Sequence, residues 1–236
     1  MEGTSLAEVW QDVFQVQSAP PQWLVIAMGV VALAAVLVRG PWRIARNVVT
    51  IAHEGGHALV AVLSGRTLTG IRLHSDTSGV TVSRGRPDGI GMILTVAVGY
   101  ITPSLVGLFG ILLLLDNRIT ALLWLSIVIL AAMLLLIRNV YGVVSIVGTG
   151  AVVFLVSWFT PADVQAGFAY LFIWFLLFAG VRPVFELQAQ RRRQPSPQSD
   201  ADQLDRLTGV PGTVWVVFFG LVNVAVVVLG VWLLLF

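Results

Sequence analysis

The stretch His53-Glu54-Gly55-Gly56-His57 lies within an otherwise uncharged apolar run from Val48 to Leu63. Read as a helix, the run puts the two histidines four residues apart, on one face and about one turn from each other. Two imidazoles at this spacing can chelate one zinc ion, and Glu54 can act as general base on an attacking water. A charged group near the bilayer centre costs about 2.5–3.5 kcal/mol, so an acid and two histidines in such a run indicate function. The run therefore predicts a zinc hydrolase that works within a membrane.

The composition is that of an integral membrane protein. Of the 236 residues 57% are hydrophobic and 11% are charged, and the mean hydropathy is +0.91. A soluble domain would carry roughly a quarter charged residues. The chain has no cysteine, so any zinc ligands must be His, Asp or Glu. The net charge is only +2 and the arginines are scattered, which indicates a lipid bilayer as the environment and no nucleic-acid partner.

Seven apolar segments approach or exceed the roughly 17–25 residues that a spanning helix needs. They are residues 22–38, 47–63, 90–115, 119–137, 140–159, 167–185 and 212–236. Only helices satisfy their backbone groups at such lengths in lipid. We therefore expect an all-α polytopic membrane protein, with about seven transmembrane helices forming a single membrane-embedded domain over residues 1–236. Residues 1–21 form a segment that precedes the bundle.

Two polar regions interrupt this pattern. Residues 66–88 alternate in polarity, which predicts a β-hairpin at about 70–84 with its turn at Ser78-Gly79. Residues 187–211 carry three arginines, Arg191 to Arg193, followed by prolines and acidic residues. This second region is expected to be a polar loop, with the three arginines as a solvated anchor.

The distribution of arginine predicts an orientation in the membrane. Four of the seven segments separate the two polar regions, so both regions should lie on the same side. That side, which includes the turn at Arg138, holds ten arginines, and the opposite side holds four. The positive-inside rule then puts both polar regions in the cytoplasm and the two histidines close beneath the cytoplasmic surface.

A catalytic zinc site needs a third protein ligand. The polar regions offer several candidates on the same side as the histidines: His74, Asp76, Asp88, Glu186, Asp200, Asp202 and Asp205. The last three come just before the final apolar segment, where a helix start can approach the membrane. Asp200 and Asp202 would equally suit the N-cap of a short helix that runs through Leu207, so the spacing alone leaves the third ligand open.

The order of these motifs resembles the site-2 protease family of intramembrane zinc metalloproteases, and within it the compact bacterial and fungal branch without PDZ domains. The HExxH motif lies on an apolar segment, a hairpin follows, and Ser199-Asp200-Ala201 precedes a later segment. Leu204, Leu207-Thr208-Gly209, Pro211 and Trp215 continue the match. The resemblance extends from about Val48 to Trp215.

The resemblance implies a zinc metallopeptidase that cleaves peptide bonds in transmembrane protein substrates. His53 and His57 would be zinc ligands, Glu54 the general base and proton shuttle, and Asp200 the third ligand, with Asp202 as the fallback. The protein would then be a multi-pass protein of a bacterial cytoplasmic membrane, with its active site near the cytoplasmic face. Nothing in the pattern sets an oligomeric state.

Three further features bear on substrate binding or on helix packing. Thr102 and Pro103 interrupt the third apolar segment and would either hold a substrate strand or form a packing kink. The hairpin edge around Val80 and Val82 could pair with an extended substrate. Asn223, deep in the last segment, is expected to hydrogen-bond a neighbouring helix, the alternative being that it polarises a substrate carbonyl group. The alternative functions are a non-catalytic metal-binding scaffold, a transporter, and a zinc hydrolase of lipids or small amides.

Overall fold

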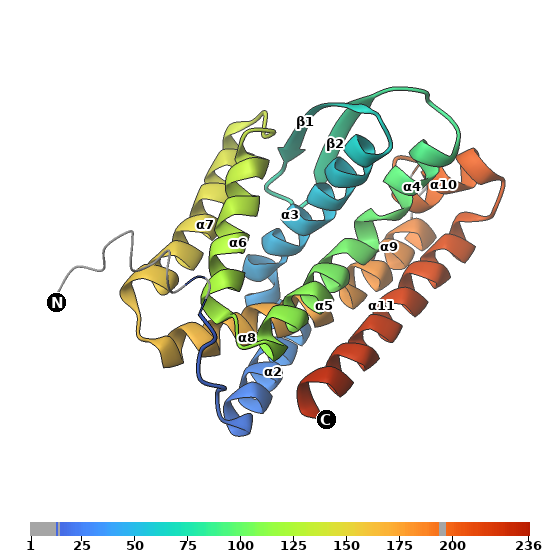
Figure 1. Ribbon diagram of the computed structural model, residues 1–236. Coiled ribbons are helices and arrows are strands. Elements are labelled where there is room, and N and C mark those ends of the chain that lie inside the picture. The colour runs from blue at the N-terminus through green and yellow to red at the C-terminus, as the bar shows by residue number, and fades with distance from the viewer. Residues whose placement is uncertain (1–12, 14, 194–196) are drawn as a thin grey trace.

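The computed structural model describes residues 13, 15–193 and 197–236, and these residues form a mostly helical bundle (Figure 1). The helices are α2 (Gln22–Leu37), α3 (Arg39–Leu63), α4 (Ile90–Ala97), the 3-10 helix η1 (Gly99–Ile101), α5 (Thr102–Leu115), α6 (Ile119–Leu134), α7 (Val140–Phe159), α8 (Ala162–Ala179), α9 (Val181–Arg193), α10 (Asp200–Thr208) and α11 (Gly212–Leu235). Strands β1 (Thr67–Leu73) and β2 (Gly79–Arg84) form one antiparallel hairpin. The predicted helical fold with a hairpin after the HExxH helix is confirmed. Most of the predicted N-terminal segment 1–21 lies outside the described residues.

All seven predicted apolar segments are helical, but fewer of them qualify as membrane spans. Within the described residues, four helical units are long and apolar enough to cross a bilayer: Ile90–Leu115, Val140–Phe159, Ala162–Arg193 and Gly212–Leu235. Helices α2 and α3 meet at a 98° bend and would add one more if they form a single broken span. Helix α6 has 16 residues, fewer than a perpendicular span requires. By length and composition, the described residues therefore hold four or five candidate spans, against the expected number of about seven.

The bend between α2 and α3 has a local cause. Val38 adopts an extended conformation, with φ −81° and ψ 130°, and Pro41 lies in the first turn of α3, where no intrahelical N–H is needed. The bend leaves the last carbonyl groups of α2 without a helical partner. The guanidinium group of Arg182 donates to the carbonyl groups of Val36 and Leu37, so a charged side chain caps this helix end.

The hairpin lies against the C-terminal half of α3, and its two edges differ. The turn spans residues 74–78, slightly before the predicted position, with Ser78 N–H donating to Asp76 Oδ1. The outer edge of β1 is closed by the α6–α7 connection: Ile71 N–H donates to Leu136 O, and Arg138 N–H donates to Ile71 O. Among the described residues, no backbone hydrogen bond joins β2 to any segment outside the hairpin. The edge of β2 is therefore open.

The region 187–211 differs from the expected polar loop, because α9 continues to Arg193 and α10 begins at Asp200. Both helices are amphipathic, and a buried cluster near the start of α11 accounts for them. The cluster contains Val96, Val184, Leu187, Ala201, Leu204, Val216 and Phe219. The helical spacing of these few apolar residues was obscured in the sequence by the arginines and prolines around them. Helix α10, α4 and the hairpin lie at the same end of the bundle (Figure 1).

Helix α11 is tied to the break in the third apolar segment by Asn223. The side-chain Nδ2 of this buried residue donates to Tyr100 O at 3.1 Å and to Phe219 O at 2.8 Å. Asn223 thus satisfies a carbonyl group at η1, where the helical hydrogen bonding is irregular. The predicted role as an interhelical hydrogen-bonding residue is confirmed.

The side chain of Asn139 holds the hairpin to the bundle. Its Nδ2 donates to Leu73 O at 2.6 Å and its Oδ1 accepts from Leu73 N–H at 3.2 Å. We expect Asn139→Leu to lower the free energy of unfolding by about 1–3 kcal/mol, because both backbone groups of Leu73 lose their partner. Thermal unfolding in detergent measures the effect. Thr69→Val, on the exposed face of β1, is the control and should change stability by less than about 0.5 kcal/mol; equal effects of the two variants would contradict the role of Asn139.

Candidate metal centre

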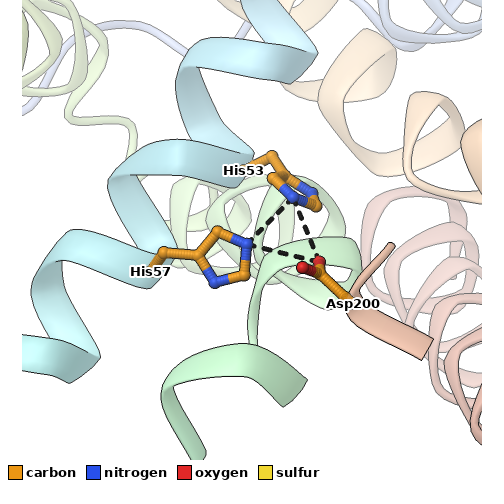
Figure 2. A group of neighbouring side chains, drawn as sticks. All are labelled: His53, His57 and Asp200. Carbon is orange, nitrogen blue, oxygen red and sulfur yellow. Dashed lines mark hydrogen bonds and ion pairs between the residues drawn. The ribbon is translucent and has the colours of Figure 1, made fainter. Parts of the chain in front are cut away.

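The candidate site contains two histidines on one face of α3. His53 and His57 are one turn apart, as the spacing predicts, and their Nε2 atoms lie 3.0 Å from each other. The rings are nearly perpendicular, with centroids 4.6 Å apart. Figure 2 shows both rings directed toward the same point beside the helix.

Asp200 completes the group from a distant part of the sequence. It is the first residue of α10, and its Oδ2 lies 3.3 Å from Nε2 of His53 and 3.3 Å from Nε2 of His57 (Figure 2). This buried oxygen accepts no hydrogen bond of acceptable geometry within the described part of the chain. Two nitrogens and one unsatisfied carboxylate oxygen, all within 4.8 Å of one another, could hold a metal ion. The residues present therefore fit the cofactor that the motif implies.

The second ring nitrogen of His57, Nδ1, contacts a backbone carbonyl group outside the candidate ligand set. Its Nδ1 lies 2.6 Å from the carbonyl oxygen of Thr95 on α4. A carbonyl oxygen can only accept, so Nδ1 carries a proton, and in the neutral ring Nε2 then keeps its lone pair for a ligand. Sequence analysis did not identify Thr95, because a backbone carbonyl group can come from any residue type.

Glycines let the break at η1 lie against the histidines. A Cβ atom on Gly99 would lie 2.4 Å from Nε2 of His57 and 2.7 Å from Cε1 of His53. A Cβ atom on Gly56 would lie 2.0 Å from Oγ1 of Thr102. The predicted interruption of this segment is thus the wall of the site, and Gly56 permits the close helix contact.

An aromatic pair covers the other side of His53. The ring of Tyr100 meets His53 edge to face, with centroids 4.8 Å apart, and it stacks on Phe219 at 5.3 Å. Phe219 is fully buried on α11. The imidazole is therefore held between helices whose packing limits its rotation.

Glu54 points toward the hairpin and does not belong to the ligand group. It is 3% exposed, and its Oε2 accepts a hydrogen bond of 2.6 Å from the hydroxyl group of Thr81 on β2. A Cβ atom on Gly79 would lie 2.5 Å from Oε1, so this glycine leaves the space that the carboxylate fills. The hairpin thus supplies the polar contact that a buried carboxylate requires.

The other carboxylates that the sequence offered have different partners. Asp202 lies 2.7 Å from the guanidinium group of Arg191 and accepts from the Ser199 hydroxyl. Burial opposes ionisation of Asp202, but the hydrogen bonds from Arg191 and Ser199 and the charge of Arg191 lower its pKa overall. Asp205 accepts from the N–H of Gly212.

The remaining candidates likewise lie apart from the two histidines. Glu186 accepts from Trp42 and Arg182, while Asp76 and His74 contact Ser78 in the hairpin turn. Asp88 is 4.0 Å from Arg86. Among the described residues, Asp200 is the acid that joins the histidines as a third candidate ligand.

The residues considered for substrate binding lie in two places. Thr102 and the buried Pro103 start α5, and Thr102 lies against Gly56, the residue before His57. The Thr102 hydroxyl donates to Val98 O. Val80 and Val82 lie on the outer face of β2 and are 48% and 44% exposed. Thr102 is therefore next to the candidate ligands, whereas the two valines face outward from the hairpin.

The contact between Gly99 and the histidines gives a test of the site's geometry. We expect Gly99→Ala to weaken metal binding at least about tenfold, because the new methyl group occupies the space of both imidazoles. Metal content and a chelator-competition titration measure this change. Gly148→Ala, at an exposed position of α7 where a Cβ atom meets nothing within 4 Å, should leave metal binding unchanged. Equal metal affinity in the two variants would disprove the arrangement.

Comparison with known proteins identifies the family of the chain. The model of the Peptidase M50B-like family matches residues 26–230, a range that contains His53, Glu54, His57 and Asp200. Searches of curated proteins and of solved structures found no match. The family is a site-2 protease family, as the motifs predicted, and the match covers most of the chain. The chain therefore belongs to the Peptidase M50B-like family.

Proposed function

We propose that the protein is an intramembrane zinc metalloprotease that hydrolyses peptide bonds of membrane-spanning substrates. The observation that carries the proposal is the convergence of His53, His57 and Asp200 inside a bundle of span-capable helices. Tetrahedral coordination at the roughly 2.0–2.1 Å usual for zinc puts neighbouring ligand atoms about 3.3 Å apart. The three separations here are 3.0, 3.3 and 3.3 Å, which supports zinc.

Each residue of the candidate site has a distinct role in the proposed reaction. A bound zinc ion would polarise the scissile carbonyl group and lower the pKa of the attacking water. Glu54 takes the proton from this water and returns it to the leaving amine. Thr81 and Gly79 hold the Glu54 carboxylate in place, and Thr95 orients His57. We assign the metal ligands as His53, His57 and Asp200 because Asp202 is engaged by Arg191.

A substrate helix must unwind before hydrolysis, since its carbonyl groups are closed in intrahelical hydrogen bonds. We propose that the unwound segment pairs with the open edge of β2. The N–H and C=O groups of Ile71 face Leu136 and Arg138, away from β2. Thr81 is the cross-strand partner of Ile71, so the backbone groups of Thr81 face the opposite, open edge. Strand addition there would bring a substrate next to Glu54.

Side chains near this path would contact the substrate. Thr102 and Pro103 lie beside the histidines at the start of α5, and Val80 and Val82 flank Thr81 on the exposed face of the hairpin. The orientation inferred from arginine positions leads us to propose that this end of the bundle faces the cytoplasm of a bacterial cell.

The substitution Glu54→Gln tests the catalytic proposal. We expect it to lower the cleavage rate by about 10²–10⁴-fold and to leave one zinc ion per protein, because Glu54 moves protons and is not a ligand. Rates are measured in liposomes on a fluorogenic peptide with one apolar helix, and zinc is measured by elemental analysis. Asp88→Asn, an exposed carboxylate change, is the control and should leave both values unchanged.

Two results would favour the alternative functions. Wild-type protein that binds zinc but cleaves no membrane-spanning peptide would favour a metal-binding scaffold or transporter. Cleavage of a lipid or small amide at a higher rate than any peptide would favour a different zinc hydrolase. Either result would contradict the peptidase proposal.

A pair of substitutions at Thr81 tests strand addition. Thr81→Pro removes the N–H that faces the open edge, and it also removes the hydroxyl bond to Glu54. Thr81→Val removes only the hydroxyl group and keeps the N–H. We expect the proline variant to cleave the same peptide at least about tenfold more slowly than the valine variant, with equal zinc content. Equal rates would rule out pairing at this edge.

A further inference from the structure

The third candidate ligand is carried by a small helix that needs external support. Helix α10 has nine residues, and an isolated helix of that length is not stable in water. Asp200 is at its first position, so any rotation or shift of α10 moves the carboxylate relative to His53 and His57. The buried residues Ala201 and Leu204 attach α10 to its apolar cluster, but apolar contacts are not directional.

Arg191 supplies a directional contact to α10 from α9. Its Nε and Nη2 donate to Oδ1 of Asp202 at 3.0 and 2.7 Å. Its Nη1 donates to Gln188 at 3.1 Å and to Thr213 on α11 at 3.4 Å. One guanidinium group thus joins three helices. The side chain of Arg191 is 14% exposed, unlike the exposed residues Arg192 and Arg193, which corrects the expectation of a solvated triple anchor.

The carboxylate of Asp202 also bonds to Ser199, the residue that caps the start of α10. Its Oδ2 accepts from the hydroxyl group of Ser199, and that same oxygen of Ser199 accepts from the N–H of Asp202 as the N-cap. A Cβ atom on Gly212 would lie 2.4 Å from Nη2 of Arg191, so this glycine leaves room for the pair. Both carboxylate oxygens of Asp202 are therefore occupied.

We propose that Arg191 is a positioning residue for the metal centre and acts through Asp202. Residues 200 and 202 lie about 200° apart around a helix axis, so they face nearly opposite sides. Fixing Asp202 against α9 fixes the direction in which Asp200 points toward α3. The inference rests on the proposed function and deepens it, because it names what orients the third ligand.

The test compares zinc affinity in Arg191→Gln and Arg192→Gln by chelator competition on the full-length protein in detergent. We expect Arg191→Gln to weaken zinc binding about 10–100-fold, as loss of outer support for a metal ligand commonly does. Cleavage of the fluorogenic peptide should fall at limiting zinc and recover at saturating zinc. Arg192→Gln, on the same helix and exposed, should match wild type. A merely structural arginine would lower the unfolding temperature without changing the zinc dependence.

Three further variants test whether Arg191 acts through Asp202. Asp202→Asn should weaken zinc binding as much as Arg191→Gln does, and the double variant should be no weaker than either single variant, because one link is broken in each. Arg191→Lys, which keeps the charge but loses the paired donors, should give an intermediate affinity. If Arg191→Gln does not fold, Asp202→Asn and Arg191→Lys give the same comparison.

The outcomes separate this inference from the proposed function. Zinc affinity in Arg191→Gln within about twofold of wild type would overturn the inference alone. Tighter zinc binding in Arg191→Gln would mean that the freed Asp202 is itself a ligand, and would also overturn it. Wild-type protein that binds no zinc would overturn the proposed function, and the inference with it.

Discussion

The structure depends on satisfying a few polar side chains inside a bundle that is otherwise apolar. His57 and Glu54 are buried on α3, and the Asp200 carboxylate lies against the two imidazoles. Unpaired polar groups in such surroundings would each cost several kcal/mol. The neighbouring elements give His57 and Glu54 their partners: the α4 carbonyl of Thr95 faces His57 and Thr81 on β2 faces Glu54. Helix α10 brings the Asp200 carboxylate, whose buried Oδ2 stays without a hydrogen bond among the described residues and so suits a metal ion. The break at η1, lined by Gly99, leaves the space in which these groups meet.

The two strands of the hairpin have different roles. Its first strand is fixed to the bundle by residues 136–139, through backbone bonds at Ile71 and the paired amide of Asn139 at Leu73. Its second strand holds Glu54 and keeps an edge without a backbone partner among the described residues. A free strand edge is usually a risk of aggregation, and proteins commonly cover it. An edge left open beside a buried carboxylate and two histidines is consistent with recognition of an extended peptide.

Arg182 and Arg191, two arginines of α9, make specific contacts rather than a general surface charge. Arg182 caps the end of α2 and also contacts Glu186, while Arg191 holds Asp202. Each guanidinium group satisfies several acceptors at once, which a lysine could not do with the same geometry. The bundle thus uses arginine to connect helices whose apolar surfaces alone would not fix their relative rotation. The Arg191 contact differs from the others in lying directly behind the helix that carries Asp200.

Local pattern in the sequence determined the helical bundle, the hairpin, the pairing of His53 with His57 and the adjacent Glu54, because helical and strand periodicity set which near neighbours share a face. The sequence also indicated Asp200, through a family resemblance, but spacing alone left Asp202 and other acids open. Only the tertiary structure decided that Asp200 meets the histidines while Asp202 turns to Arg191. It also decided the helical state of residues around 187–211 and the role of the Thr95 carbonyl. These features depend on contacts between residues far apart in the chain, and such contacts follow from helix packing rather than from local periodicity.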